Sequence, residues 1–177
     1  PLLEKYKNLD SRIKVVYRQK NGGIVKASND ALKLAAGAYV GLLDNDDELS
    51  KDALYEVVNA LQETKYDLIY SDEDKLSMEG KRCEPFFKPD WSPDLLLSIN
   101  YVSHFGVYRR KIVQELGGFR DGFDGSQDYD LVLRFTEKTQ NIKHLPKILY
   151  HWRKIPGSTA AQFDAKPYAF ASAKKAL

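Results

Sequence analysis

Apolar and polar residues follow two different periods along the first half of the chain. Between Ile24 and Ala36 the apolar residues recur every three or four positions, which predicts an amphipathic helix that Gly37 ends. The run 38–43 is short and continuously apolar, which predicts a buried parallel strand. Ahead of them we expect a helical segment at 2–9 and a strand at 13–17. This part of the chain therefore already switches between helical and strand periods.

The same switch recurs farther along. Residues 51–63 return to helical spacing, and residues 67–70 have the composition of a further strand. Strands that alternate with helices in this way favour an α/β fold, Rossmann-like, with a mostly parallel sheet flanked by helices. The apolar face expected for the helix at 51–63 consists of Leu54, Val57, Val58 and Leu61.

The second half of the chain has a less regular pattern. Its prolines and glycines divide it into short pieces, and no internal repeat is present. We expect, in order, a loop at 75–92, a short helix at 93–99, a strand at 102–108, a helix at 110–116 that Gly117 and Gly118 end, a polar loop at 120–126, a helix at 127–138, two short strands in 142–150 around Pro146, and the start of a helix at 169–177.

Composition excludes several classes of protein. The 177 residues fit one domain, 1–177, and a net charge of +2 argues against a nucleic-acid partner. No apolar run is long enough to span a bilayer, so we expect a cytoplasmic protein, peripheral to the inner face of the membrane at most through other parts. The single Cys83 excludes an intrachain disulfide and a cysteine-based zinc cluster.

The most informative polar segment is Asp44-Asn45-Asp46-Asp47, directly after the expected strand 38–43. Acidic residues at the carboxyl end of a buried strand lie where open α/β sheets bind ligands. Asp44 and Asp46 are two apart, so in extended chain their carboxylates point to the same side and can hold a divalent cation together with a diphosphate. The alternative is that these acids only cap and polarise the start of the helix at 51–63.

A second acidic candidate is Asp128, near the start of the helix at 127–138. It lies on the same helical face as the apolar residues Leu131, Val132 and Phe135. A carboxylate on an inward face is costly unless it lines a cleft or is paired, which makes Asp128 a candidate general base. The alternative is a dipole partner at the helix N-terminus. Asp130 and Arg134 are four apart and predict a structural ion pair.

Weaker candidates follow from position alone. His151 ends an apolar run and can complete a metal site that already has carboxylates, although a packed surface histidine is the commoner outcome. Arg153 or Lys154, followed by Gly157-Ser158-Thr159, has the chemistry to bind phosphate, although basic residues near a chain end are more often simply solvated. His104 lies at the edge of an expected strand, and the acids at 72–74 either add to the negative field of the cleft or are plain loop residues.

Taken together, these segments resemble family 2 glycosyltransferases with the GT-A fold, in order and spacing over residues 13–160. The pattern is most similar to that of bacterial cell-surface polysaccharide and rhamnosyltransferase-like enzymes. The matching segments are Asn21-Gly22-Gly23 with Ala27-Ser28-Asn29, Ala36-Gly37-Ala38-Tyr39-Val40, Leu43-Asp44-Asn45-Asp46-Asp47, Tyr108-Arg109-Arg110, Leu116-Gly117-Gly118-Phe119, Gln127-Asp128-Tyr129-Asp130-Leu131, and Tyr150-His151-Trp152-Arg153 with Gly157-Ser158-Thr159.

The resemblance implies a role for each matched residue. Asp44 and Asp46 correspond to the Asp-x-Asp motif, which holds a nucleotide-diphosphate sugar through Mg²⁺ or Mn²⁺, with Asp46 favoured as direct ligand. His151 corresponds to a histidine that approaches the metal and the diphosphate, and Asp128 to the catalytic base of inverting members. Gln127 stands where the family often has Glu. The substrate-binding residues implied in this way are Asp44, Asn29, His104, Gln127 and Arg153.

One departure from the family is large. The strands and the Asp-Asp-Gly-Ser type segment with which the family begins, and which contact the nucleotide, do not occur before Pro1. We therefore expect a GT-A fold truncated at its N-terminus, which binds nucleotide-sugar poorly and transfers little sugar by itself. Within it, 1–74 would be the donor and metal-binding part, 75–160 the acceptor and catalytic part, and 161–177 the start of a C-terminal helix.

The implied partners are a nucleotide-diphosphate sugar, a glycan or lipid-linked acceptor, and further domains of the same polypeptide. Two other functions stay open. A sugar nucleotidyltransferase also combines an α/β sheet, acidic residues and a metal, but it releases pyrophosphate. A non-catalytic GT-A-like domain that binds a glycan or partner is the other, and metal-dependent binding of a diphosphate would separate it from both enzymes.

Overall fold

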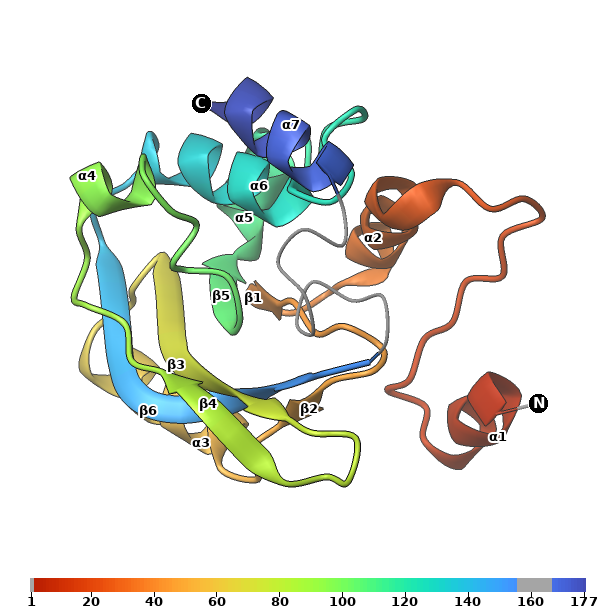
Figure 1. Ribbon diagram of the computed structural model, residues 1–177. Coiled ribbons are helices and arrows are strands. Elements are labelled where there is room, and N and C mark those ends of the chain that lie inside the picture. The colour runs from red at the N-terminus through yellow and green to blue at the C-terminus, as the bar shows by residue number, and fades with distance from the viewer. Residues whose placement is uncertain (1, 156–166) are drawn as a thin grey trace.

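The computed structural model describes residues 2–155 and 167–177, and within them a sheet of six strands lies between two groups of helices (Figure 1). The strands are β1 (Tyr39–Gly41), β2 (Glu48–Leu49), β3 (Leu68–Leu76), β4 (Arg82–Phe86), β5 (Gly106–Arg109) and β6 (Ile142–Arg153). The helices are α1 (Leu2–Leu9), α2 (Gly23–Leu34), α3 (Ala53–Glu63), α4 (Pro93–Leu96), α5 (Arg110–Glu115), α6 (Gln127–Thr136) and α7 (Pro167–Ala176).

The sheet has the order β1-β5-β3-β6-β2, with β4 added beside β3, and it is mixed rather than mostly parallel. Among the strands of the described residues, β3 and β6 pair in parallel and the other pairs are antiparallel. Strands β1 and β3 do run in the same direction, as their alternation with α3 predicts, because both are antiparallel to β5. The expectation of a mostly parallel sheet is wrong because β5 arrives from an irregular segment and inserts between them.

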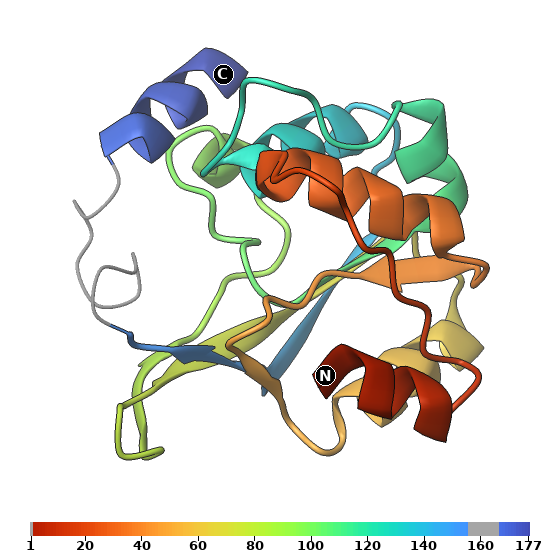
Figure 2. The same cartoon turned by 90° about the vertical axis from the view of Figure 1, so that its right-hand side faces the viewer.

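Both faces of the sheet are covered, which Figure 2 shows from the side. On one face α2, α5 and α6 pack on the side chains of Leu68, Tyr70 and Tyr108. On the other face α3 packs on Ile69 and Val107. Neighbouring residues of β3 and β5 thus belong to opposite cores, as the two-residue period of a strand requires.

Two local predictions fail in the first half. Residues 13–17 form no strand, and Ile13, Val16 and Tyr17 stay exposed, since no other described strand pairs with them. Helix α3 buries Ala53, Val57 and Ala60, so the predicted face is correct for Val57 and for the partly buried Leu61, whereas Leu54 and Val58 are exposed.

The second half contains more strand than the sequence predicts. Strand β3 continues through residues 71–76, and β4 pairs with it inside the stretch 75–92 that reads as a loop. Strand β6 passes through Pro146 without a break in the strand, and its pairing with β3 only shifts register between Ser71 and Glu73. A register shift accommodates the missing N–H of a proline, which otherwise interrupts a ladder.

The predicted helices at 2–9, 24–36, 93–99, 110–116, 127–138 and 169–177 are confirmed as α1, α2, α4, α5, α6 and α7, with ends that differ by a few residues. The turn after α5 depends on Gly118, which has a positive φ of 74°. A Cβ there would come within 2.5 Å of Asn29 Oδ1, so a glycine is required at this contact. Each helix in the described part of the chain is too short or too polar to cross a membrane.

Candidate active site

One cavity of about 1720 Å³ gathers most of the residues that the sequence singles out. Asp44 and Asp46 line it from the loop after β1, His104 from the segment before β5, and Gln127 and Asp128 from the start of α6. Candidate site residues from segments far apart in the sequence therefore line the same cavity.

The acidic loop between β1 and β2 is fastened to β6 by its last carboxylate. Asp47 accepts hydrogen bonds from the Tyr150 hydroxyl at 2.5 Å and from the Arg153 backbone N–H at 2.8 Å. The same Tyr150 hydroxyl accepts the Asp44 N–H at 3.2 Å, and Arg153 Nε donates to the Asp46 carbonyl at 2.7 Å. With its backbone held in this way, the loop presents the side chains of Asp44 and Asp46 to the cavity.

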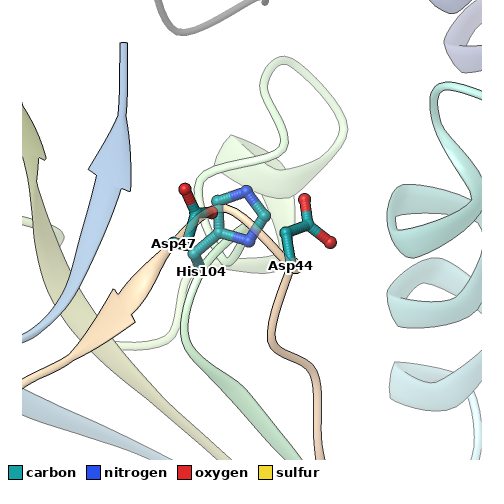
Figure 3. A group of neighbouring side chains, drawn as sticks. All are labelled: Asp44, Asp47 and His104. Atoms are coloured by element: carbon teal, nitrogen blue, oxygen red, sulfur yellow. The ribbon is translucent and has the colours of Figure 1, made fainter. Parts of the chain in front are cut away.

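A histidine from another part of the chain meets this loop. Ligand atoms of Asp44, Asp47 and His104 all lie within 4.8 Å of one another, and Figure 3 shows the imidazole between the two carboxylates. The ring of His104 stacks on Tyr150 with centroids 4.7 Å apart and meets Trp152 edge-on at 5.3 Å. Packing against these two aromatic rings of β6 therefore restricts the orientation of the His104 imidazole.

The position of Asp44 in the cavity raises the pKa of its carboxyl. The loop is exposed, but the cavity walls still remove water from this side chain, and that desolvation is the main cause that raises the Asp44 pKa. His104 acts in the opposite direction, and the carboxylates of Asp47, Asp128 and Asp46 raise the pKa further. A site that concentrates negative charge in this way is suited to a cation.

Asp128 faces the cavity from the first turn of α6. Its Oδ2 accepts a hydrogen bond from Asn100 Nδ2 at 2.8 Å, and its side chain is only partly buried. Two residues on, Asp130 is fully buried and bound by Arg134 at 2.7 Å and by Arg120. The predicted Asp130–Arg134 ion pair is therefore confirmed, and the two acids of one helix have different surroundings.

The other predicted substrate-binding residues differ in where the structure places them. Gln127 lines the cavity, and its Oε1 accepts the Gly125 N–H at 2.9 Å. The Arg153 guanidinium donates to a backbone carbonyl of the acidic loop and forms an ion pair with Glu48. Asn29 is not among the residues that line the cavity, and its amide exchanges hydrogen bonds of 2.8 and 2.9 Å with the backbone of Phe119. Gly157-Ser158-Thr159 lie outside the described residues.

The predicted metal ligand His151 is engaged elsewhere in the described structure. Its Nδ1 lies 2.5 Å from Asp74 Oδ1, and Arg82 Nε binds the other oxygen of that carboxylate at 2.6 Å. His151 is buried on β6 and does not line the cavity. His104, taken as a substrate-binding residue from the sequence, is the histidine that the fold brings to Asp44.

The acids at 72–74 belong to strand β3 rather than to a loop, and of the three Glu73 also lines the cavity. They are buried in β3, and each has a basic or histidine partner. Asp72 binds His144 at 2.8 Å, Glu73 binds Lys88 at 2.8 Å, and Asp74 binds Arg82 and His151. The expectation of a loop fails because β4 and β6 flank β3 and bury this stretch.

Sequence reasoning missed Asn100 and the anchoring role of Asp47. The signal for Asp47 was present, since it belongs to the acidic tetrad and its partner Tyr150 directly precedes the singled-out His151. Asn100 had no signal, because it lies in an irregular segment 28 residues from Asp128.

The donor set near the loop fits a hard divalent cation. Carboxylate oxygens are the ligands that Mg²⁺ and Mn²⁺ prefer, and an imidazole is a common further ligand of Mn²⁺. Asp44 is common to the predicted set and to the group with Asp47 and His104, while Asp46 lines the same cavity. Each oxygen of Asp47 accepts one protein hydrogen bond, so each retains a lone pair for another contact.

Comparison with known proteins gives relatives in polysaccharide synthesis. The chain is 45% identical over 154 residues to the O-antigen biosynthesis protein RfbC of Myxococcus xanthus, with 86% of the chain and 12% of that protein covered. It is 33% identical to the chondroitin synthase of Escherichia coli, over 75% of the chain and 20% of that protein. An uncharacterized protein of Sinorhizobium fredii is 49% identical over 99% of the chain and 20% of its own length. The chain thus spans a fifth or less of these relatives.

Solved structures agree on the fold. The crystal structure of Staphylococcus aureus TarS 1–349 in complex with UDP-GlcNAc superposes with a TM-score of 0.73 at 23% identity, over 91% of this chain and 47% of that one. The fold is therefore the GT-A fold of glycosyltransferases, here as an α/β structure with a mixed sheet. The model of the family described as Glycosyl transferase family 2 matches residues 1–117, about two thirds of the chain, and the chain therefore belongs to this family.

Proposed function

We propose that this chain carries the catalytic site of an inverting, metal-dependent glycosyltransferase that moves a sugar from a nucleotide-diphosphate donor to a glycan hydroxyl. The observation that supports it best is the shared cavity, with Asp44, Asp46 and His104 on one wall and Asp128 on another. Membership of glycosyl transferase family 2 sets the reaction class. The proposed division at residue 74 places the metal-binding acids in the first part and the base in the second.

Asp44 and Asp46 are the proposed carboxylate ligands of Mg²⁺ or Mn²⁺, and His104 rather than His151 is the proposed imidazole. His104 is preferred because it lies beside Asp44, whereas Asp74 already holds the Nδ1 of His151. Asp47 supports the loop through Tyr150 and Arg153. A bound cation would neutralise the diphosphate that leaves.

The donor proposed for this site is a nucleoside diphosphate sugar, with uridine as the first base to test. Structures of TarS, the fold neighbour, contain UDP-GlcNAc and UDP. The carboxylates that gather in the cavity would repel a diphosphate, so a bound cation would be needed for the donor to bind. Donor binding that depends on the metal is thus the main consequence of this arrangement.

Asp128 is the proposed general base. As the acceptor oxygen attacks the anomeric carbon, the bond from that carbon to the diphosphate oxygen breaks, and the hydroxyl proton passes to Asp128. Asn100 orients this carboxylate by donating to Oδ2, which leaves Oδ1 for the acceptor. A single displacement of this kind inverts the anomeric configuration.

The proposed acceptor is a hydroxyl of a cell-surface glycan, free or lipid-linked. The relatives in M. xanthus and E. coli are named for O-antigen biosynthesis and for chondroitin synthesis. Their names support a polysaccharide acceptor and do not distinguish which sugar is transferred.

The test is a titration of UDP, GDP and dTDP into this chain, with and without Mn²⁺, by calorimetry. The proposal expects binding of at least one nucleotide that requires Mn²⁺ and weakens about 10-fold or more in Asp46→Ala and in Asp44→Ala. Asp52→Asn is the control, since it removes one exposed carboxylate outside the cavity.

Mn²⁺-dependent binding that survives in both loop variants would contradict the assignment of the metal site. Weak binding in every variant agrees with the expectation that this chain binds donor poorly, so Mn²⁺ binding alone is then measured by electron paramagnetic resonance. If Mn²⁺ binds equally to the wild type and to Asp44→Ala, the proposed site is wrong.

A further inference from the structure

The side chain of Lys88, which comes shortly after β4, is completely buried in the middle of the protein. Its Nζ donates to Glu73 Oε2 at 2.8 Å, to the Val102 carbonyl at 3.0 Å, and to the His104 carbonyl. An ammonium group has three donors, and here each of them has an acceptor. A buried charge is tolerated only when it is satisfied in this way.

Glu73 uses the same oxygen for a second purpose. Its Oε2 also accepts the His104 backbone N–H at 3.2 Å. Both backbone groups of His104, together with the Val102 carbonyl, are therefore bound by the Lys88–Glu73 pair. Residues 97–105 belong to no helix or strand, so this ion pair supplies the hydrogen bonds that a sheet ladder would otherwise give.

His104 is in turn connected to the acidic loop through Tyr150. Its ring stacks on Tyr150, whose hydroxyl donates to Asp47 and accepts from the Asp44 N–H. A continuous series of contacts thus leads from Lys88 to the group formed by Asp44, Asp47 and His104. Lys88 itself is not among the residues that line the cavity, whereas its partner Glu73 is, so Lys88 acts on a ligand only through its contacts.

We propose that the buried Lys88–Glu73 pair is a positioning device that sets the His104 imidazole against Asp44 for metal binding. The inference rests on the proposed function, because it concerns the same metal site. It adds that a residue outside the cavity controls the affinity of that site. A pair that only stabilised the fold would leave the metal affinity of the folded protein unchanged.

The decisive variant is Lys88→Met, which removes the three donors and keeps a chain of similar length. We expect the Mn²⁺ dissociation constant of the folded protein to rise about 10-fold or more, the range seen when residues that orient metal ligands are lost. Mn²⁺ binding is measured by electron paramagnetic resonance, and broadening of the His104 ring signals by Mn²⁺ is measured by NMR. Those signals are assigned with His104→Gln.

Asp130→Asn is the matched control. It also removes a fully buried carboxylate from its ion pairs with Arg134 and Arg120, but Asp130 does not line the cavity. Both variants are compared at a temperature where circular dichroism shows them folded. In the control we expect the wild-type Mn²⁺ affinity and the wild-type broadening of His104.

If Lys88→Met does not fold, the double variant Lys88→Met/Glu73→Gln removes the unpaired buried charge and keeps an acceptor for the His104 N–H. We expect its Mn²⁺ affinity to stay weaker than that of the wild type by about 10-fold, since the two carbonyls have lost their donor. Wild-type affinity and broadening in the folded Lys88 variants would overturn the positioning role. A wild-type chain whose Mn²⁺ binding does not depend on Asp44 would instead overturn the proposed function, and the inference with it.

Discussion

Two acidic segments of this chain have nearly the same composition and opposite surroundings. In Asp44-Asn45-Asp46-Asp47 the first two carboxylates lie on an exposed loop and face a cavity. In Asp72-Glu73-Asp74 every carboxylate is buried within β3 and bound by a basic or histidine side chain. The difference comes from the neighbouring strands, because the loop leads into the short edge strand β2, whereas β3 has strands on both sides.

This contrast indicates that the interaction partners of a carboxylate, more than the number of acids in a segment, distinguish a binding site from a structural network. Each of the buried acids has a basic or histidine partner in the protein, and of the three Glu73 alone also lines the cavity. The loop acids Asp44 and Asp46 are held by backbone contacts, which leave their carboxylates available. The same distinction separates Asp128 from Asp130 within a single helix.

The largest effect is expected in α6. Asp128→Asn keeps the shape and the contact with Asn100 but removes the proposed base, so the rate of sugar transfer should fall about 10²–10⁴-fold. Stability should change by less than about 0.5 kcal/mol, because this side chain is not part of a buried pair. The rate is measured in the longer polypeptide expected to include this chain, with a UDP-sugar and Mn²⁺.

Asp130→Asn provides the contrasting result in the same helix. It should lower the free energy of unfolding by about 2–4 kcal/mol, since two arginines lose their buried partner. The transfer rate per folded molecule should stay near that of the wild type. An Asp128→Asn protein that retains its rate would show that the comparison does not extend to catalysis.

The second effect compares one chemical change in the two acidic segments. In the wild type, His144 Nε2 and the backbone N–H of Lys88 each lie 2.8 Å from the buried Asp72 carboxylate. Asp72→Asn replaces that carboxylate with an amide. It should lower the unfolding free energy in urea by about 1–3 kcal/mol. Asp44→Asn, on the exposed loop, should change it by about 0.5 kcal/mol or less. Equal losses would mean that the loop acids are structural too.

A third and smaller effect uses the cation as a stabiliser. Mn²⁺ at ten times its dissociation constant should raise the unfolding free energy by about 1.4 kcal/mol, if only the folded chain binds it. The rise should disappear in Asp44→Asn and persist in Asp72→Asn, and removal of the metal with a chelator should reverse it. Thermal unfolding with and without Mn²⁺ measures this effect, and a rise of equal size in Asp44→Asn would contradict it.

The sequence predicts those parts of the molecule that depend on neighbours along the chain. The helices, the strand before the acidic loop and the inward side of Asp128 all follow from spacing of a few residues. It does not predict contacts between distant segments. The insertion of β5 between β1 and β3, and the bond from Tyr150 to Asp47 across 103 residues, depend on tertiary packing that no local pattern contains.

The same reason explains why the sequence does not predict that His104 lies beside Asp44. A histidine at a strand edge reads the same whether it packs on a surface or meets two carboxylates. Only the fold, through Lys88, Glu73 and the stacking on Tyr150, brings it beside the loop. The family resemblance implied His151 as the imidazole ligand, and in the structure its Nδ1 lies beside Asp74.

The smallest effect is expected at Glu84, an exposed acid with two lysine partners. Comparing it with the acids of β3 measures how much burial adds to the stability that an ion pair contributes. Glu84 is bound by Lys154 at 2.5 Å and Lys75 at 2.7 Å, and these lysines lower the pKa of Glu84 from 4.5 to about 2. Because the folded-state pKa is the lower one, the stabilisation is present above pH 4.5 and is lost as the pH falls toward about 2. Solvent screens these exposed charges, so the gain is small.

Glu84→Gln should therefore be slightly less stable than the wild type at pH 7, and the difference should vanish near pH 2, as measured by urea unfolding across that range. Glu115→Gln, which breaks the exposed pair with Lys111, is the charge-matched control. A difference that grew as the pH fell would mean that the sign of the Glu84 interaction is wrong. A loss at pH 7 as large as that of Asp72→Asn would mean that burial is not what makes the acids of β3 structural.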